Sequence, residues 1–366
     1  MRLASLSLED LRVFREARLE PGTGINVLVG DNGTGKTTVL EAIQLLSSGR
    51  SFRGGVRDAL IRRGQPALRV YSEIVAEPME RRVGMGLSRS LRAWSARIDG
   101  QAVETLTRLF QELAVVCFEP GSHALISGGS EHRRRFIDWA LFHVEPDFLS
   151  VWRRYQRALR QRNALLKQPM VSANLDPWEH ELALHGAALT RLREAWLARL
   201  QPGLSAMVAR FAPGLGAATP KYSSGGSPAS DGEAGLLAAL RQARGRDQAL
   251  GHTSVGPHRA DWSLAFEAAP VREMLSRGQE KLVVLSCLLA QAQAFAEVRG
   301  QWPVLVLDDL PSELDRGHLA HTLEWLASVP AQSFITATAA PELPHASCRP
   351  MRMFHVEQGR VAALLY

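Results

Sequence analysis

Lysine is scarce in this chain of 366 residues, occurring only at Lys36, Lys167, Lys221 and Lys281. None of the four is followed two residues later by aspartate, so the lysine-containing motif with which GTP-driven switches recognise guanine is absent. The sequence therefore excludes that class of protein. Arginine supplies nearly all of the positive charge, which makes a lysine inside a motif unusually informative here.

Cysteine is also rare, and long apolar runs are missing. Cys117, Cys287 and Cys348 lie far apart and in no metal-ligand spacing, a pattern that favours a reducing compartment. The longest apolar candidate, 282–296, is interrupted by a serine and two glutamines, short of the roughly 18 apolar residues of a membrane span. Residues 1–14 carry charges where a signal peptide would be apolar. We expect a soluble, cytoplasmic protein.

The remaining composition is that of a globular protein with a basic balance. Hydrophobic residues make up 46% of the chain and charged residues 22%, and the length suggests about two domains. The formal net charge is +6. A positive balance is compatible with nucleic acid as a partner, because clustered arginines and lysines bind phosphates.

Strand patterns dominate the first hundred residues, and the last of them runs into Asp99-Gly100, a dipeptide typical of tight turns. From Glu131 onward the pattern is helical, with Trp178, Leu182 and Leu189 recurring at the spacing of one helix face. The stretch Pro213–Gly235 is rich in Gly, Ser, Ala and Pro and is predicted to be a loop or linker.

Alternating strands and helices at both ends of the chain enclose this helical block. We predict an α/β domain formed by residues 1–130 and 236–366, with a mainly helical insertion at 131–235.

A phosphate-binding motif occupies residues 30–37. It reads GDNGTGKT and fits G-x-x-x-x-G-K-[ST], after the apolar strand 25–29 and before a helical pattern. In such a loop the glycines let backbone N–H groups surround phosphate oxygens at a helix N-terminus. Lys36 is expected to reach the β- and γ-phosphates of a nucleotide, and the Thr37 hydroxyl to bind Mg²⁺. The predicted nucleotide-binding residues are Gly30, Asp31, Asn32, Gly33, Thr34, Gly35, Lys36, Thr37 and Thr38.

Two carboxylates end an apolar strand near the other end of the chain. Residues 304–307 read VLVL and are followed by Asp308 and Asp309, the form of a Walker B strand. Asp308 is predicted to lie on the Mg²⁺ side, with Lys36 and both aspartates as the catalytic residues.

A further motif, LSRGQ at 275–279, opens a long helical pattern and resembles the LSGGQ signature of ABC-type ATPases. The resemblance implies that Ser276, Arg277, Gly278 and Gln279 complete the nucleotide site of a second subunit. Ser312 and Asp315 resemble the D-loop of the same superfamily. Taken alone, LSRGQ would equally suit an ordinary serine helix cap.

The spacing and several strings identify the branch. Lys36 and Ser276 lie 240 residues apart, too far for a compact transporter ATPase, and the helical insertion is too short for a long coiled coil. The chain resembles the RecF family of DNA-repair proteins in the strings Ser51–Arg53, Leu60–Arg62, Arg133–Asp138, Gln161–Lys167 and Gly256–Arg259. The implied fold is an ABC-type ATPase head, with a parallel sheet and an antiparallel lobe, carrying an inserted helical lobe.

The chain departs from the family pattern at several places. Ala260 precedes Asp261 where two aspartates are usual, the segment 118–123 lacks the acidic residue that the family pattern has near Gly121, and no Q-loop glutamine is visible. Asp309 stands where ABC ATPases usually carry glutamate, and the hydroxyls of Thr336 and Thr338 replace the switch histidine. Weak ATP hydrolysis is therefore expected.

The resemblance also implies partners. These are ATP with Mg²⁺, an ATP-dependent second copy of the chain, double-stranded DNA near single-strand gaps, and a RecR-type mediator in recombinational repair and replication. No helix-turn-helix, zinc finger or RNP motif appears. DNA contacts are therefore expected to be phosphate contacts from basic clusters. The candidates are Arg53, Arg57, Arg133, Arg134, Arg153, Arg157 and Arg160.

For the arginines at 153, 157 and 160, a solvated face of an amphipathic helix is an equally simple interpretation. One or two arginines of the 133–135 run could instead pair with carboxylates. Two other functions also stay open. The chain could be an ABC-type ATPase subunit with a partner other than DNA, or a DNA-binding scaffold with negligible hydrolysis.

Overall fold

The structure, a computed structural model, describes residues 1–53, 57–76, 80–90, 93–168, 175–226, 232–269, 274–340 and 351–364, with the backbone alone at 57 and 58. The chain forms two compact units, of which the first consists of 1–122 and 281–366 and the second of 123–280. The inserted unit is therefore longer than the predicted 131–235. The difference arises because the segments after 235 pack against the helices of the insertion.

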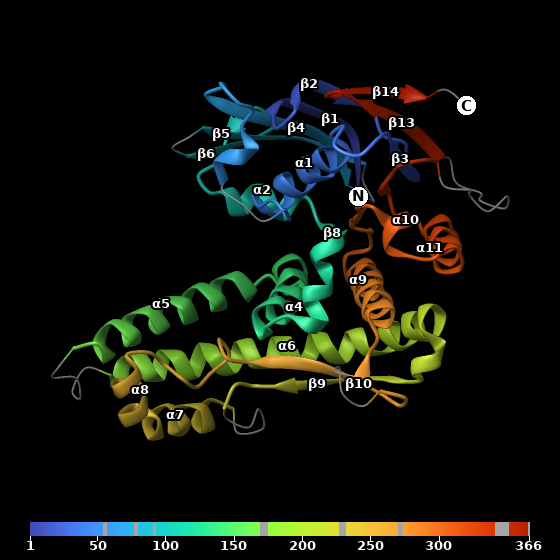
Figure 1. The fold of residues 1–366 in the computed structure, drawn as a ribbon. Coiled ribbons are helices and arrows are strands. Elements are labelled where there is room, and N and C mark those ends of the chain that lie inside the picture. Colours follow the sequence, from blue (N-terminus) through green and yellow to red (C-terminus); the bar gives the residue numbers. More distant parts are fainter. Residues whose placement is uncertain are drawn as a thin grey trace. The chain divides into compact units, whose positions relative to one another are not determined.

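A six-stranded, mostly parallel sheet forms the centre of the first unit (Figure 1). Its strands in spatial order are β14 (Arg360–Leu364), β13 (Met351–Glu357), β3 (Ile25–Val29), β12 (Ser333–Ala337), β11 (Val304–Leu307) and β8 (Val115–Phe118). Every residue of β3, β11 and β12 is buried, as expected for parallel strands covered on both faces. Only β14 runs antiparallel.

An antiparallel sheet completes the first unit. Its order is β2 (Phe14–Leu19), β1 (Arg2–Leu11), β4 (Ala67–Ala76), β5 (Arg81–Ser90), β6 (Trp94–Ile98) and β7 (Gln101–Ala102). The predicted Asp99-Gly100 turn is confirmed: both residues have positive φ, 50° and 78°, and they join β6 to β7. Helix α1 (Lys36–Ser48) packs against strands of both sheets through a buried apolar face, which fixes the phosphate loop at its start. Short elements follow at η1 (Arg57–Leu60), α2 (Leu106–Glu112), α10 (Leu310–Glu313) and α11 (Arg316–Ser328).

The second unit is built on three helices, α4 (Ser130–Val144), α5 (Phe148–Leu166) and α6 (Asp176–Phe211). Leu182, Leu189 and Trp196 of the predicted helix face are buried on α6. The long linker predicted at 213–235 is wrong in part, because β9 (Ala218–Ser223) lies within it and pairs antiparallel with β10 (Asp261–Phe266). Residues 227–231 of that stretch lie outside the described residues.

The second unit also contains α3 (Ala124–Ser127), α7 (Gly232–Gln242) and α8 (Arg244–Leu250). Helix α9 (Arg277–Arg299) begins in the second unit and belongs to the first from Lys281 onward. By length and composition it is the one helix in the described part of the chain that could cross a membrane, and 61% of its apolar window is buried inside the protein. The core helix of a soluble protein passes the same test.

Candidate nucleotide site

The loop between β3 and α1 has the backbone that phosphate binding requires. Gly30, Gly33 and Gly35 adopt φ values of 153°, 83° and 114°, which side chains rarely allow. A Cβ on Gly30 would lie 2.2 Å from the backbone oxygen of Val356, and one on Gly35 would lie 2.8 Å from the ring of Phe14. Glycine at these two positions therefore follows from close packing as well as from backbone angle.

Lys36 is held at the mouth of this loop. Its Nζ donates hydrogen bonds of 2.7 Å to the backbone oxygens of Gly30 and Asp31. Burial lowers the pKa of Lys36, while the carboxylates of Asp309, Asp308 and Asp31 oppose that shift. The ammonium is thus fixed where a phosphate at the helix N-terminus would meet it.

Asp308 and Asp309 end β11 beside the loop and differ in their contacts. One carboxylate oxygen of Asp308 accepts hydrogen bonds of 2.8 Å from the hydroxyls of Thr37 and Thr336. Burial raises the pKa of Asp308, which these hydrogen bonds and the charge of Arg53 counter. A buried carboxylate next to a threonine hydroxyl at the phosphate loop is a donor set that suits Mg²⁺.

Mg²⁺ at nucleotide sites takes one or two protein oxygens and completes its shell with phosphate and water. Among the described residues, no group of three or more His, Cys, Asp or Glu side chains is placed to hold a metal by itself. The pair formed by Thr37 and Asp308 therefore fits a nucleotide-bound Mg²⁺ and does not fit a free-standing metal centre.

Asp309 adopts the left-handed conformation, with φ of 54°, and lies at the N-terminus of α10. Its carboxylate accepts a 2.8 Å hydrogen bond from Ser312, and its N–H donates to Thr336. Thr336 therefore joins both aspartates through one hydroxyl. Ser312, one of the two residues that resemble a D-loop, thus donates to the carboxylate that the sequence predicts to act in hydrolysis.

A cavity of about 630 Å³ is lined by these groups and by residues that the sequence did not predict for the site. Arg12 comes from the turn between β1 and β2, and Glu119 with Pro120 comes from the end of β8. Glu119 directly follows the strand that pairs with β11, and this pairing brings it to the cavity beside Asp308. The arginine of the SFR string, Arg53, also lines the cavity.

A buried carboxylate connects two of these cavity segments. Glu41, on the second turn of α1, has no exposed surface and forms a two-point ion pair with Arg12. Glu41 also accepts a hydrogen bond from Ser51, whose hydroxyl in turn contacts the backbone oxygen of Arg53. One acidic side chain thus fixes the positions of both arginine-bearing segments.

Replacing Glu41 with Gln is expected to lower the free energy of unfolding by about 1–3 kcal/mol, because the charge-assisted hydrogen bonds become neutral ones inside the protein. Urea unfolding of Glu41→Gln, Arg12→Gln and the double variant measures the coupling between the two side chains. Glu112→Gln, which removes a half-buried carboxylate paired with Arg81, is the matched control. Purely additive effects of Glu41→Gln and Arg12→Gln would contradict this assignment.

The signature segment caps its own helix. Ser276 N–H donates to the Gln279 side chain at 2.8 Å, and Gln279 N–H donates to the Ser276 hydroxyl oxygen at 3.2 Å. This is a capping box, so the simpler interpretation of LSRGQ describes part of its role. Ser276, Arg277 and Gly278 are nevertheless exposed. The Ser276 hydroxyl acts as an acceptor in this capping box, which therefore does not use the hydroxyl proton.

The chain is similar to known proteins over nearly its whole length. The family described as "RecF/RecN/SMC N terminal domain" matches residues 2–362. The "DNA replication and repair protein RecF" of Stenotrophomonas maltophilia (strain R551-3) is 53% identical, with both chains covered completely. That of Thioalkalivibrio sulfidiphilus (strain HL-EbGR7) is 36% identical over 98% of each chain. The chain belongs to the RecF family.

Solved structures agree with this assignment. The structure titled "Structure of the recombination mediator protein RecF-ATP in RecFOR pathway" matches with a TM-score of 0.89 and 25% identity, over 99% of this chain and 97% of that one. An Smc head bound to the C-terminal winged-helix domain of ScpA matches with a TM-score of 0.61 and 14% identity, which shows a shared fold alone. The predicted α/β ABC-type head with an antiparallel lobe is confirmed.

Two of the arginines proposed as DNA contacts form ion pairs or hydrogen bonds inside the protein. Arg133 is buried and forms a two-point ion pair with Asp261, at 2.7 and 2.9 Å. Arg134 donates to the backbone oxygen of Ala260 and to Ser130. We therefore withdraw Arg133 as a DNA contact. Its guanidinium instead pairs with Asp261, the single aspartate that follows the string Gly256–Arg259.

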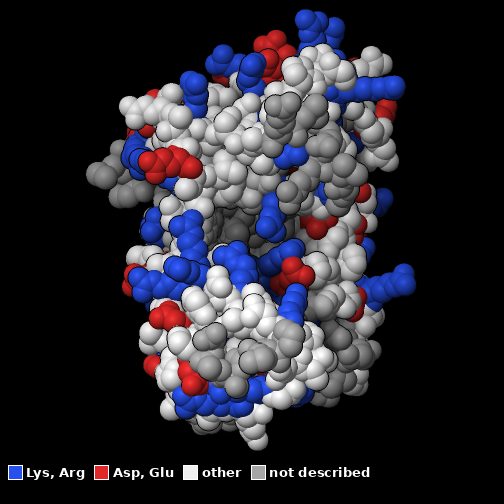
Figure 2. All heavy atoms as spheres, turned by 90° about the vertical axis from the view of Figure 1, so that its left-hand side faces the viewer, with Lys and Arg blue, Asp and Glu red and all other residues white. Residues whose placement is uncertain are grey.

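The other basic candidates whose side chains the structure describes are exposed. Arg153, Arg157 and Arg160 lie on the exposed face of α5, and Arg154, which sequence spacing did not select, is exposed beside them. Figure 2 shows Lys and Arg side chains gathered on the face of the inserted unit that carries this helix. Arg53 is exposed at the nucleotide cavity, and the side chain of Arg57 lies outside the described residues.

Proposed function

We propose that this RecF family member is an ATP-dependent DNA-binding clamp with weak ATPase activity. The supporting observation is the assembly of Lys36, Thr37 and Asp308 around a glycine loop that leaves room for a nucleotide. A protein of the same fold and 25% identity is described as RecF-ATP. The loop N–H groups and Lys36 would bind the ATP phosphates, and Thr37 with Asp308 would hold Mg²⁺.

Hydrolysis is expected to be slow because the second carboxylate is restrained. Asp309 is shorter than the usual glutamate, and its contact with Ser312 directs it toward α10. An attacking water would therefore be polarised from a less favourable position. The same restraint favours, as a second candidate function, a DNA-binding scaffold that uses ATP binding with negligible turnover.

Dimerisation would complete the site. The signature residues Ser276 to Gln279, of which the first three are exposed, present a helix N-terminus that suits the γ-phosphate bound by another copy. The D-loop residues Ser312 and Asp315 would lie beside the same contact. The nucleotide would then act as the link between two subunits, so that DNA is retained while ATP is bound.

DNA would be held through its phosphates by Arg153, Arg157 and Arg160, with Arg53, Arg57 and Arg134 as further candidates. Binding of this kind is independent of base sequence and weakens steeply with salt. Duplex next to a single-strand gap is the proposed substrate. A RecR-type mediator is the proposed protein partner, since the related structure is assigned to the RecFOR pathway.

A mixing experiment tests the clamp. Lys36→Met removes the phosphate contact and Ser276→Arg blocks the signature, so each variant alone is expected to stay monomeric with Mg-ATP in sedimentation. A 1:1 mixture should recover about a quarter or more of the wild-type ATPase rate, because a mixed dimer keeps one intact composite site of two. Recovery should coincide with ATP-dependent retention of gapped duplex. A mixture as inactive as its components would contradict a site shared between subunits.

A further inference from the structure

Three arginines on α5 have no partner among the residues that the structure describes. Arg154, Arg157 and Arg160 are exposed and make no ion pair or hydrogen bond with any described residue. Arginines elsewhere in the same unit, such as Arg193 and Arg244, pair closely with carboxylates. On α5 three such unpaired arginines lie within two helical turns of one another.

Two of these arginines border a crevice between α5 and α6. A cavity of about 340 Å³ is lined by Arg154, Arg157 and Ala158 of α5 and by Trp178 and Glu181 of α6. Trp178 is half-buried, so part of its indole ring faces the crevice, and the small side chain of Ala158 leaves space next to it. The volume lies at the lower end of the roughly 300–1,000 Å³ of small-molecule sites.

Glu181 is the acidic group of the crevice. Its carboxylate lies 3.1 Å from Nε2 of His185, one helical turn further along α6. The other two polar groups are guanidinium cations, so the positive charge exceeds the negative charge in this α5–α6 crevice.

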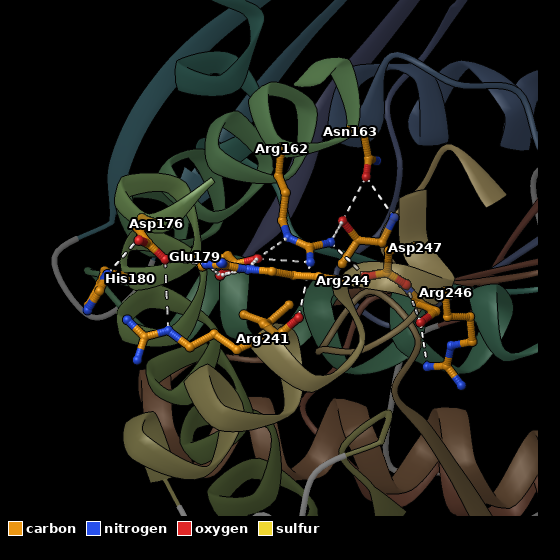
Figure 3. Close-up of polar contacts among 12 residues, drawn as sticks. Arg162, Asn163, Asp176, Glu179, His180, Arg241, Arg244, Arg246 and Asp247 are labelled. Atoms are coloured by element: carbon orange, nitrogen blue, oxygen red, sulfur yellow. Dashed lines mark hydrogen bonds and ion pairs between the residues drawn. The ribbon is translucent and has the colours of Figure 1, made fainter. Parts of the chain in front are cut away.

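A buried ion network fixes the walls of the crevice (Figure 3). Arg162, one turn after Ala158, and Glu179, the residue after Trp178, have no exposed side-chain surface and pair at 3.0 Å. Arg162 also donates to Asp247 of α8 at 2.7 Å, and Arg244 binds Glu179 from the other side. Since each charge is matched inside the protein, α5 and α6 are held at a fixed separation next to the crevice.

We infer that the α5–α6 crevice binds an unstacked nucleobase, with Trp178 stacking on the base and Arg154 and Arg157 contacting the flanking phosphates. An aromatic face beside free guanidinium groups is the combination with which proteins hold single-stranded nucleic acid. Such a site gives a duplex-binding surface a way to recognise the single strand at a gap. This inference rests on the proposed DNA-binding function and assigns a part of it to named residues.

The test distinguishes a contact with the nucleobase from contacts with the flanking phosphates. Anisotropy with Mg-ATP compares a blunt duplex, the same duplex with a thymine overhang, and one whose overhang is abasic. The wild type is expected to prefer the thymine overhang over the abasic one about fivefold or more, given the usual strength of base–aromatic stacking. Trp178→Ala should abolish that preference and leave blunt-duplex binding unchanged, whereas Trp178→Phe should retain it and excludes a folding defect.

The arginines give an independent readout. The double change Arg154→Gln and Arg157→Gln should weaken both overhangs, because it removes phosphate contacts, while Arg135→Gln, an exposed arginine paired with Glu131, is the control. A thymine preference that persists in Trp178→Ala overturns the inference, as does its absence in the wild type. Displacement of the overhang by an equimolar acidic tyrosine-containing peptide would instead assign the crevice to a protein ligand.

These measurements distinguish failure of the proposed clamp function from failure of the proposed nucleobase site in the α5–α6 crevice. If the wild type does not retain blunt duplex with Mg-ATP, the proposed function fails. Single-stranded thymine and abasic oligonucleotides then decide the crevice by themselves, since neither contains a duplex. Equal affinity for those two probes overturns the inference, and a thymine preference that requires Trp178 supports it.

Discussion

Lys36→Met is expected to weaken Mg-ATP binding by about 10- to 100-fold, the loss associated with removing one charge-assisted contact to an anion. The effect has two origins in the structure. The ammonium that would meet the β- and γ-phosphates is lost, and so are its hydrogen bonds to the backbone oxygens of Gly30 and Asp31. Calorimetric titration of Mg-ATP into both proteins measures the change.

The scarcity of lysine makes the control for Lys36→Met simple. Lys221→Met removes an exposed lysine on β9, outside the nucleotide cavity, and should leave ATP affinity unchanged. A Lys36→Met variant that binds Mg-ATP within threefold of the wild type would mean that the loop does not use its lysine for phosphate.

Arg162→Met is expected to lower the free energy of unfolding by about 3–5 kcal/mol, because removing one partner of a buried ion network leaves uncompensated charge inside the protein. Arg162 donates to Glu179, Asp247, Thr253 and the backbone oxygen of Leu240. Methionine replaces its volume without replacing any of these hydrogen bonds. Urea unfolding followed by circular dichroism measures the loss.

Two further variants define the cause of that loss. Arg162→Lys should recover little of the stability, since an ammonium cannot donate in the planar fork that reaches two carboxylates at once. Arg135→Met, which breaks an exposed pair one turn apart on α4, should cost at most about 0.5 kcal/mol. A loss below about 1 kcal/mol for Arg162→Met would show that the network contributes little to stability.

Motifs made from neighbouring residues could be predicted from the sequence. The glycine loop at 30–37 and the strand at 304–307 carry their own structural signals, because the loop conformation and the apolar strand are local properties. The helical block also followed from spacing. These elements fixed the fold class and most of the nucleotide site.

Residues that tertiary structure brings to the site could not be predicted in this way. Arg12 reaches the cavity because β1 and β2 turn beside α1, and Glu119 because β8 pairs with β11. Arg133 shows the reverse: a run of three arginines suggested a surface, whereas its partner Asp261 lies 128 residues away. β9 was missed because a strand with Gly and Pro nearby is stabilised by pairing with β10, which no local pattern records.

The position of β3 in its sheet has a consequence for synthesis of the protein. β3 lies between β12 and β13, and Gly30 packs against the backbone oxygen of Val356, so both neighbours of the phosphate loop strand come from the last tenth of the chain. The segment 123–280 is continuous and can fold as it leaves the ribosome. The phosphate loop strand can gain both neighbours only after residues 333–357 have been translated, so a chain that stops before them would contain the whole segment 123–280 but would lack two strands beside the nucleotide cavity.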